Sequence, residues 1–353
     1  MKRLIIIIAL VQCFLSMLSA RSAGQVLRHS VGANGIGLGG AYGAIVKDPS
    51  ALYWNPAGLA HINGETRIEK RMDLSKEAEQ AFDEKFEEFM SDDEAGKKKP
   101  AQQEKKESPQ PTTETVRSFE MQVFASASLL SLDRNLGFSA VAFTAPGGTY
   151  AVGLLGAQVK GIDGYDSLGN STGEKKFQST TGYIGYAREM GSSRIGLSVN
   201  GIYENIGGNT LNGGGLNVGA QVTPFPLIDL GIDVQNLVGA IQNQAVPNSS
   251  YDKLDTILRF SLGISTPPPS SSMRLLLGFR TNLDDREKEG FTINIGLAIA
   301  LTRSIYIMGG FENGNFGGGI GALFFNRLKF AYALNRDPLG IGFQHTLELN
   351  LRI

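Results

Sequence analysis

Apolar and polar residues alternate over most of the chain that follows residue 117. One stretch alternates Ile195, Leu197 and Val199 with Gly196, Ser198 and Asn200. A period of two residues is typical of a β-strand with one apolar face and one polar face. Fourteen stretches of this kind are predicted as strands, at 118–130, 136–146, 149–160, 179–189, 192–206, 214–223, 227–238, 255–265, 272–282, 290–300, 303–312, 315–324, 327–335 and 343–353. The pattern therefore predicts an all-β protein.

A soluble sandwich also shows this alternation, so the lengths of the links between strands carry the argument further. Short links near Gly191, Pro224–Pro226 and Asn326 contrast with longer ones such as 161–178 and 239–254. Short turns at one end, longer loops at the other and an even number of strands are typical of outer-membrane barrels. We therefore predict a transmembrane outer-membrane β-barrel of about 14 antiparallel strands at 117–353, located in the bacterial outer membrane and surrounded by its lipid.

The first residues resemble a secretion signal. Met1-Lys2-Arg3 is basic, an apolar run extends to Leu18, and Leu18-Ser19-Ala20 supplies small residues for a signal peptidase. We predict a signal peptide at 1–20. A lipoprotein signal at Cys13 and a transmembrane anchor are the alternatives. The apolar run continues past Cys13 and is short for an anchor, which favours cleavage near Ala20.

A highly charged block interrupts the chain before the predicted barrel. Residues 73–107 hold 19 charged side chains, 12 acidic and 7 basic. The block opens with a helical stripe formed by Leu74, Ala78, Phe82, Phe86, Phe89 and Met90, and its end resembles a disordered tract. We predict that 61–116 is a charged insertion, partly helical and partly disordered. If both ends of the barrel chain are periplasmic, the insertion is periplasmic too, either as a solvated spacer or with 73–107 binding a periplasmic partner.

Composition excludes several classes of function. Lys and Arg total 33 against 34 Asp and Glu, a net charge of -1, which lacks the basic surface that nucleic-acid binding needs. With three histidines (His29, His61, His345) and one cysteine, we expect no metal site, disulfide framework or cofactor. The chain has no Gly-x-Ser-x-Gly motif, so we predict that it is not an enzyme. Gly35, Gly37 and Gly40 match a dinucleotide fingerprint, but the required preceding strand and following acidic residue are missing.

The segment before the charged block carries a resemblance to a known family. Gly-Leu-Gly-Gly-Ala-Tyr (37–42), Asp48-Pro49-Ser50-Ala51 and Tyr53-Trp54-Asn55-Pro56-Ala57-Gly58-Leu59 resemble the mature start of PorV/PorQ-type outer-membrane proteins, which are relatives of FadL. Val234–Leu237 and Phe330–Leu334 are also similar to that family. The resemblance implies that residues 21–60 fold into the lumen as a plug, to which Asp48, Tyr53, Trp54, Asn55 and Pro56 would belong. The chain departs from the family in its long 61–116 block and in ending on Ile353 rather than an aromatic residue, which bears on recognition by the barrel-assembly machinery.

The resemblance implies two functions. A FadL-like protein would be a passive transporter of small hydrophobic molecules. A PorV-like protein would be a non-transporting accessory that anchors or receives secreted proteins at the cell surface, as in type IX-like secretion. The partner is accordingly a hydrophobic small molecule or a secreted protein. Transport is favoured because a plugged barrel is a natural gate, although the predicted lumen positions (Ser198, Asn200, Asn217, Gln221, Asp229, Asp233, Gln235) are polar and indicate no apolar pocket.

Overall fold

The computed structural model describes part of the chain in detail: residues 29–62, 66–71, 112–117, 119–165, 168, 170–244, 251–266, 273–284, 291–337 and 341–353. The predicted signal peptide and the predicted helix within 73–107 lie outside these ranges. The chain forms two compact units, Met1–Ile62 with Phe119–Ile353, and Asn63–Ser118. Each is described by itself.

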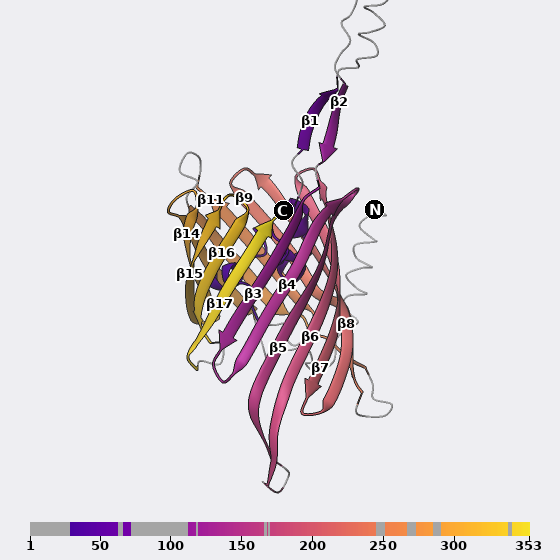
Figure 1. Ribbon diagram of the computed structural model, residues 1–353, viewed down its shortest axis with the longest axis vertical. Helices are drawn as coiled ribbons and strands as arrows, with labels where there is room; N and C mark the ends of the chain where they lie inside the picture. The colour runs from indigo at the N-terminus through magenta and orange to yellow at the C-terminus, as the bar shows by residue number, and fades with distance from the viewer. Residues whose placement is uncertain are drawn as a thin grey trace, which may run out of the picture. The chain divides into compact units, whose positions relative to one another are not determined.

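The larger unit contains a closed antiparallel barrel (Figure 1). Its fourteen strands are β3 (Met121–Leu130), β4 (Arg134–Ala145), β5 (Gly148–Tyr165), β6 (Ser171–Met190), β7 (Ser193–Ile206), β8 (Asn209–Phe225), β9 (Ile228–Asn243), β11 (Ile257–Ser265), β12 (Met273–Asn282), β13 (Phe291–Ala300), β14 (Ile305–Glu312), β15 (Asn315–Phe324), β16 (Leu328–Arg336) and β17 (Phe343–Arg352). The first and last of them, β3 and β17, pair with each other, which closes the ring. A short strand, β10 (Tyr251–Lys253), pairs with the end of β9. The predicted fourteen-strand fold is confirmed.

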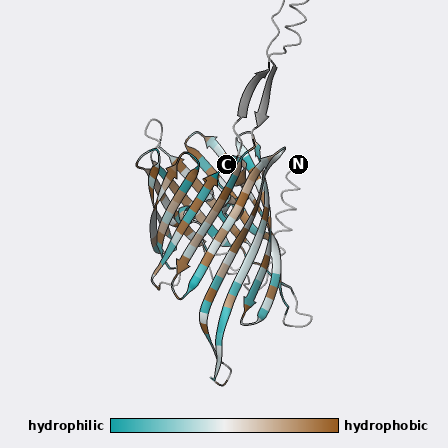
Figure 2. Ribbon diagram, viewed as in Figure 1, coloured by the Kyte–Doolittle hydropathy of each residue, from teal (hydrophilic) through white to brown (hydrophobic). Residues whose placement is uncertain are grey.

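The two faces of the strands differ as the alternation predicts. On β7, Ser198 and Asn200 point into the bore and are buried, whereas Leu197 and Val199 are exposed on the outside. Figure 2 shows the resulting brown and teal alternation along the strands. Outward aromatic pairs lie near both ends of the barrel, Phe143 with Tyr150 at one end and Phe311 with Phe316 at the other. An outward apolar wall flanked by aromatic residues is the surface of an outer-membrane barrel. Among the described residues, no helix has the length and apolar character needed to cross a membrane.

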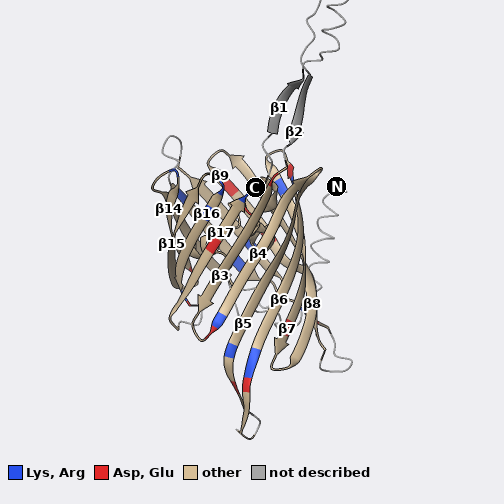
Figure 3. Cartoon of the chain, viewed as in Figure 1, with Lys and Arg blue, Asp and Glu red and all other residues tan. Residues whose placement is uncertain are grey.

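Some strands are longer than the alternation predicts. β5 and β6 extend to Tyr165 and back from Ser171, well beyond the stretches 149–160 and 179–189. These extensions carry charged residues such as Lys160 and Glu174. Figure 3 shows charged positions toward the far ends of β5 and β6. Both faces of an extension beyond the membrane meet water, so the apolar–polar contrast that identifies a strand is weak there.

The N-terminal segment, residues 29–62, fills the bore. It forms two short helices, α2 (Ala33–Gly37) and α3 (Ala51–Trp54), and the 3₁₀-helix η2 (Pro56–His61). α2 packs against β14 to β17, while η2 packs against β5 to β8. These strands lie on different sides of the ring, so the segment contacts them from within. Almost every residue from Val31 to Ala60 is buried.

The smaller unit shows one hairpin within its described residues. β1 (Thr66–Arg71) pairs with β2 (Thr112–Arg117) in an antiparallel ladder. The sequence pattern did not predict these strands, which lie at the two ends of the charged insertion. Their pairing brings the two ends of that insertion together.

Candidate functional site

Inward glycines hold the N-terminal segment against the barrel wall. On nine successive strands of the ring, a Cβ added to an inward glycine would collide with the segment. We call these residues the glycine belt: Gly153, Gly185, Gly196, Gly219, Gly231, Gly263, Gly278, Gly296 and Gly310. At Gly231, for example, the Cβ position lies 2.8 Å from Cα of Ala44. Because glycine alone permits this approach of two backbones, the belt is a socket shaped for the segment.

Asp48 and Asn55, two of the residues that the family resemblance places in the plug, order the segment itself. The Asp48 carboxylate accepts hydrogen bonds from the Tyr42 hydroxyl and from the backbone N–H of Ser50, both at 3.0 Å, and so fixes the turn before α3. Asn55 Oδ1 accepts a bond from the Ala57 N–H at 3.1 Å and caps η2. Pro56 follows at the first helical position, where its missing N–H costs nothing.

Asn55 and Pro56 also join the segment to the wall. The Asn55 side-chain amide donates to the Ala220 carbonyl of β8 at 3.2 Å. The backbone of Pro56 lies against Gly196 of the glycine belt. The Asn55-Pro56 pair therefore both begins the helix η2 and contacts the barrel wall, so this short motif fixes the position of η2 in the bore.

Tyr53 and Trp54 form the aromatic centre of the segment. Their rings meet edge to face with centroids 5.3 Å apart. The Trp54 indole N–H donates to the Val31 carbonyl at 3.0 Å, and the Tyr53 hydroxyl donates to the His29 carbonyl at 2.7 Å. Burial raises the pKa of Tyr53 to about 12, so its hydroxyl remains a donor at neutral pH. These bonds tie the start of the segment to α3.

A buried ion pair on the wall anchors this aromatic centre. Arg259 of β11 donates from Nε to the Asp233 carboxylate of β9 at 2.9 Å, and from its terminal nitrogen to the Tyr53 carbonyl at 2.8 Å. The guanidinium also lies over the Tyr53 and Trp54 rings, 5.5 and 5.7 Å from their centroids. The sequence analysis placed Asp233 in the lumen but missed Arg259, whose signal is a charged residue at an inward position of an apolar strand.

A second anchor holds α2. The Glu348 carboxylate of β17 accepts hydrogen bonds from the backbone N–H of Asn34, at 3.0 Å, and from the Asn34 side chain. Lys329 of β16 lies 3.7 Å from the same carboxylate. The Tyr306 hydroxyl of β14 donates to Asn34 Oδ1 at 2.8 Å. β17 and β14 thus both bond to Asn34, while Lys329 of β16 pairs with the same Glu348 carboxylate.

The bore is less polar than the sequence suggested. Phe124 and Phe138 point inward, are almost fully buried, and have ring centroids 5.8 Å apart; Tyr183 continues the cluster. Leu155, Ile202 and Leu276 are also buried at inward positions. Because the segment packs against them, these apolar inward residues belong to a protein core, alongside buried polar residues such as Asn200 and Gln235.

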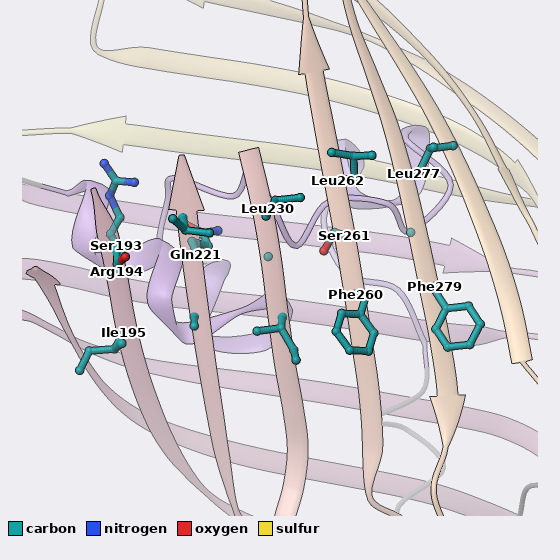
Figure 4. A pocket seen from close by; sticks show the side chains of 15 residues that line it. Ser193, Arg194, Ile195, Gln221, Leu230, Phe260, Ser261, Leu262, Leu277 and Phe279 are labelled. Atoms are coloured by element: carbon teal, nitrogen blue, oxygen red, sulfur yellow. The ribbon is translucent and has the colours of Figure 1, made fainter. Parts of the chain in front are cut away.

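Two hollows adjoin this core. One, of about 770 Å³, lies on the outer wall over β7 to β12; Figure 4 shows Ile195, Phe260 and Phe279 in its lining. Those side chains face lipid. The other, of about 470 Å³, lies between the segment and the inner wall, with apolar residues such as Leu38, Ile45 and Met308 and the cations Lys47, Arg274 and Lys329 in its lining. We take the inner cavity as the candidate site because residues of both the segment and the barrel line it.

The described residues offer no grouping of three or more His, Cys, Asp or Glu side chains able to hold a metal ion. Two of the three histidines, His61 and His345, have a hydrogen-bond partner on another side chain. His61 lies 3.0 Å from Gln221 Oε1 at the segment's end, and His345 lies 2.8 Å from the Tyr332 hydroxyl on the outer face.

Comparison with known proteins identifies the fold. No protein-family model matches the sequence, and no curated protein matches it. The toluene transporter TbuX of Ralstonia pickettii is similar in structure, with a TM-score of 0.52, 10% identity, and coverage of 92% of this chain and 97% of that one. The monoaromatic hydrocarbon channel CymD matches with a TM-score of 0.53 and 10% identity, covering 92% of this chain and 96% of that one. A deltaS2 mutant of the monoaromatic hydrocarbon channel TodX matches with a TM-score of 0.51 and 9% identity, covering 91% of this chain and 97% of that one.

At such low identity these matches show a shared fold, that of a closed outer-membrane β-barrel. They confirm the predicted fold class and the location in the bacterial outer membrane. The matched proteins are channels and transporters rather than enzymes, which fits the prediction of a non-enzyme. The narrower resemblance to PorV/PorQ-type proteins stays a prediction, and the accessory alternative gains no support.

Proposed function

We propose that this protein carries small hydrophobic molecules passively across the bacterial outer membrane, with residues 29–62 acting as a plug. The observation that carries the proposal is the inner cavity of about 470 Å³ between the segment and the wall. A concave, partly apolar cavity with a few polar groups is the usual form of a small-molecule site. The shared fold with hydrocarbon channels supports the same substrate class.

The filled bore also supports a hydrophobic substrate. Within the described residues, the glycine belt and the buried apolar residues bring the segment against the wall of the bore, which disfavours the passage of hydrated solutes there. For an apolar molecule, by contrast, transfer from water into such an interior is favourable, and a concentration gradient suffices to drive its net movement. On this proposal Asp48, Tyr53, Trp54, Asn55 and Pro56 act by holding the plug in shape and position rather than by chemistry.

Uptake of radiolabelled toluene tests the proposal. The chain is expressed in a Gram-negative strain that lacks its own hydrocarbon channels, where the outer membrane limits entry of hydrophobic compounds. We expect a higher initial uptake rate than in cells with an empty vector, and no change in the entry of a hydrophilic sugar. Unchanged toluene uptake would contradict transport. If deletion of the gene also removed secreted proteins from the surface of the native cell, the PorV-like accessory function would replace it.

A further inference from the structure

The inner face of β14, β15 and β16 differs from the rest of the bore. Three inward rungs cross these strands: Tyr306–Gly321–Ala331, Met308–Gly319–Ala333 and Gly310–Gly317–Asn335. The middle strand has no inward side chain at any of the three rungs. We call the surface over Gly317, Gly319 and Gly321 the β15 groove.

Side chains, rather than the segment's backbone, cover the β15 groove. The Cβ position of Gly319 lies 2.9 Å from Cε of Met308, and that of Gly321 falls against the ring of Tyr306. In the glycine belt the covering atoms include segment backbone, as at Gly231, where Cα of Ala44 lies above the glycine. A side chain can change its rotamer while the backbone stays in place, whereas moving a packed backbone requires a collective motion. The β15 groove can therefore open by the movement of side chains alone.

Met308 forms a wedge between the segment and the groove. On its other side lies Gly37 of α2, whose Cβ position is 2.7 Å from Sδ of Met308. The side chain is buried, 6% exposed, between two glycines on facing elements. When Met308 swings aside, neither Gly37 nor Gly319 has a side chain to fill the gap.

Both ends of the groove carry a further indication of a bound molecule. At the end near Gly321, Tyr306 and Met308 border the inner cavity of about 470 Å³. At the other end Asn335, 7% exposed, lies over Gly317, with its Oδ1 3.0 Å from the glycine's Cβ position. Within the described residues this oxygen has no hydrogen-bond partner. A buried amide oxygen without a partner is costly, and a water molecule is expected to satisfy it, because a hydrocarbon has no hydrogen to donate.

We propose that a small hydrophobic molecule passes the plug along the β15 groove, by displacing the side chains of Met308 and Tyr306. The route rests on the proposed transport function and specifies where the molecule moves. Met308 sets the width of the passage, since its removal leaves glycine on both sides. Asn335 meets the molecule at one end, and the inner cavity receives it at the other.

Thiol labelling tests the route without measuring transport. The predicted mature chain has no cysteine, so Met308→Cys introduces a single thiol in the groove. Ser198→Cys, at an equally buried inward position of β7, is the matched control. In outer-membrane vesicles, benzyl methanethiosulfonate is expected to label Met308→Cys about tenfold faster, which corresponds to a barrier lower by about 1.4 kcal/mol. Excess toluene should slow this labelling. Equal rates at the two positions, or no effect of toluene, would overturn the route.

A pair of cavity-creating variants tests the wedge. Met308→Ala should raise the initial rate of toluene uptake several-fold, whereas Leu276→Ala, which removes a buried inward side chain on β12, should leave it unchanged. Assembly of each variant is checked by its shift on unheated gels. If the wild type itself gives no uptake above the vector, the transport proposal fails. If the wild type transports but Met308→Ala matches Leu276→Ala, the transport proposal survives and the route is wrong.

Discussion

Some residues in the bore matter for the side chain that they lack, and others for the contacts that they make. Gly196 and Gly219 face each other on β7 and β8, and both lie under the Asn55-Pro56 pair of the segment. Composition showed the excess of glycine, 45 residues, but not its use. A strand pattern assigns a glycine to one face or the other, whereas its partner across the bore depends on how the segment folds. The belt could not be predicted from the sequence for that reason.

Gly196→Val should dislodge the segment. The added Cβ would meet the backbone of Pro56, which cannot turn aside, so we expect a loss of about 1–3 kcal/mol as for other overpacked cores. The chain's one tryptophan, Trp54, reports on the segment, and its fluorescence should shift to longer wavelength. Gly182→Ala, where the added Cβ meets nothing within 4 Å, is the control. An unshifted spectrum for Gly196→Val would show that the belt does not hold the segment.

Removing one partner of the buried Arg259–Asp233 ion pair should lower the free energy of unfolding more than removing both partners. Arg259→Met leaves the Asp233 carboxylate buried without its cation, at a cost of about 3–5 kcal/mol. The double variant Arg259→Met with Asp233→Leu removes both charges and should recover much of that loss. Urea unfolding in detergent micelles measures both. A double variant that is less stable by the sum of the two single losses would mean that the pair is not coupled.

At the scale of elements, the strands were predictable because one face meets lipid. All fourteen predicted stretches overlap observed strands, and the errors lie at ends where the contrast disappears, as in the extensions of β5 and β6. The inward apolar residues, such as Phe124, were not anticipated. A rule that places polar residues inside describes an aqueous pore, and here the segment turns the bore into a core.

An irregularity in β9 gives a test at this scale. Asn236 has φ 51° and follows Gln235 with both side chains buried, so the pairing with β8 shifts register between Leu216 and Val218. Its N–H donates to Asn217 at 2.9 Å and its amide donates to the Asp255 carbonyl at 3.2 Å. Asn236→Gly keeps the backbone and loses side-chain bonds, at about 0.5–1.5 kcal/mol each.

Asn236→Val, by contrast, must also force a β-branched residue into the left-handed region, which adds about 1–3 kcal/mol. The midpoint of thermal unfolding, followed by circular dichroism, should therefore be highest for the wild type, lower for Asn236→Gly and lowest for Asn236→Val. The reverse order of the two variants would mean that β9 adopts a regular conformation at this residue.

For the whole molecule, the segment's path determines where the charged insertion leaves the barrel. Ser30 donates to Glu312 at one end of the bore, next to the link after β14. Ile62 accepts a bond from Thr149 at the opposite end, near the turn between β4 and β5. The first barrel strand starts at that same end, where the N–H of Met121 bonds to the carbonyl of Ile353. Ile62 and Met121, which lie just before and just after the insertion in the sequence, are therefore both at the end of the barrel that holds Ile353.

In outer-membrane barrels the short turns and chain ends face the periplasm, so residues 63–118 should be protected from outside. We expect protease added to intact cells to leave this unit uncut, and to cleave within the lysine-rich stretch 97–106 once the outer membrane is permeabilised. A tag inserted in the link after β5 should show the opposite accessibility and serves as the control. Cleavage of 63–118 in intact cells would reverse the orientation, and the inner cavity, which lies toward that end, would then open to the cell exterior and receive the substrate first.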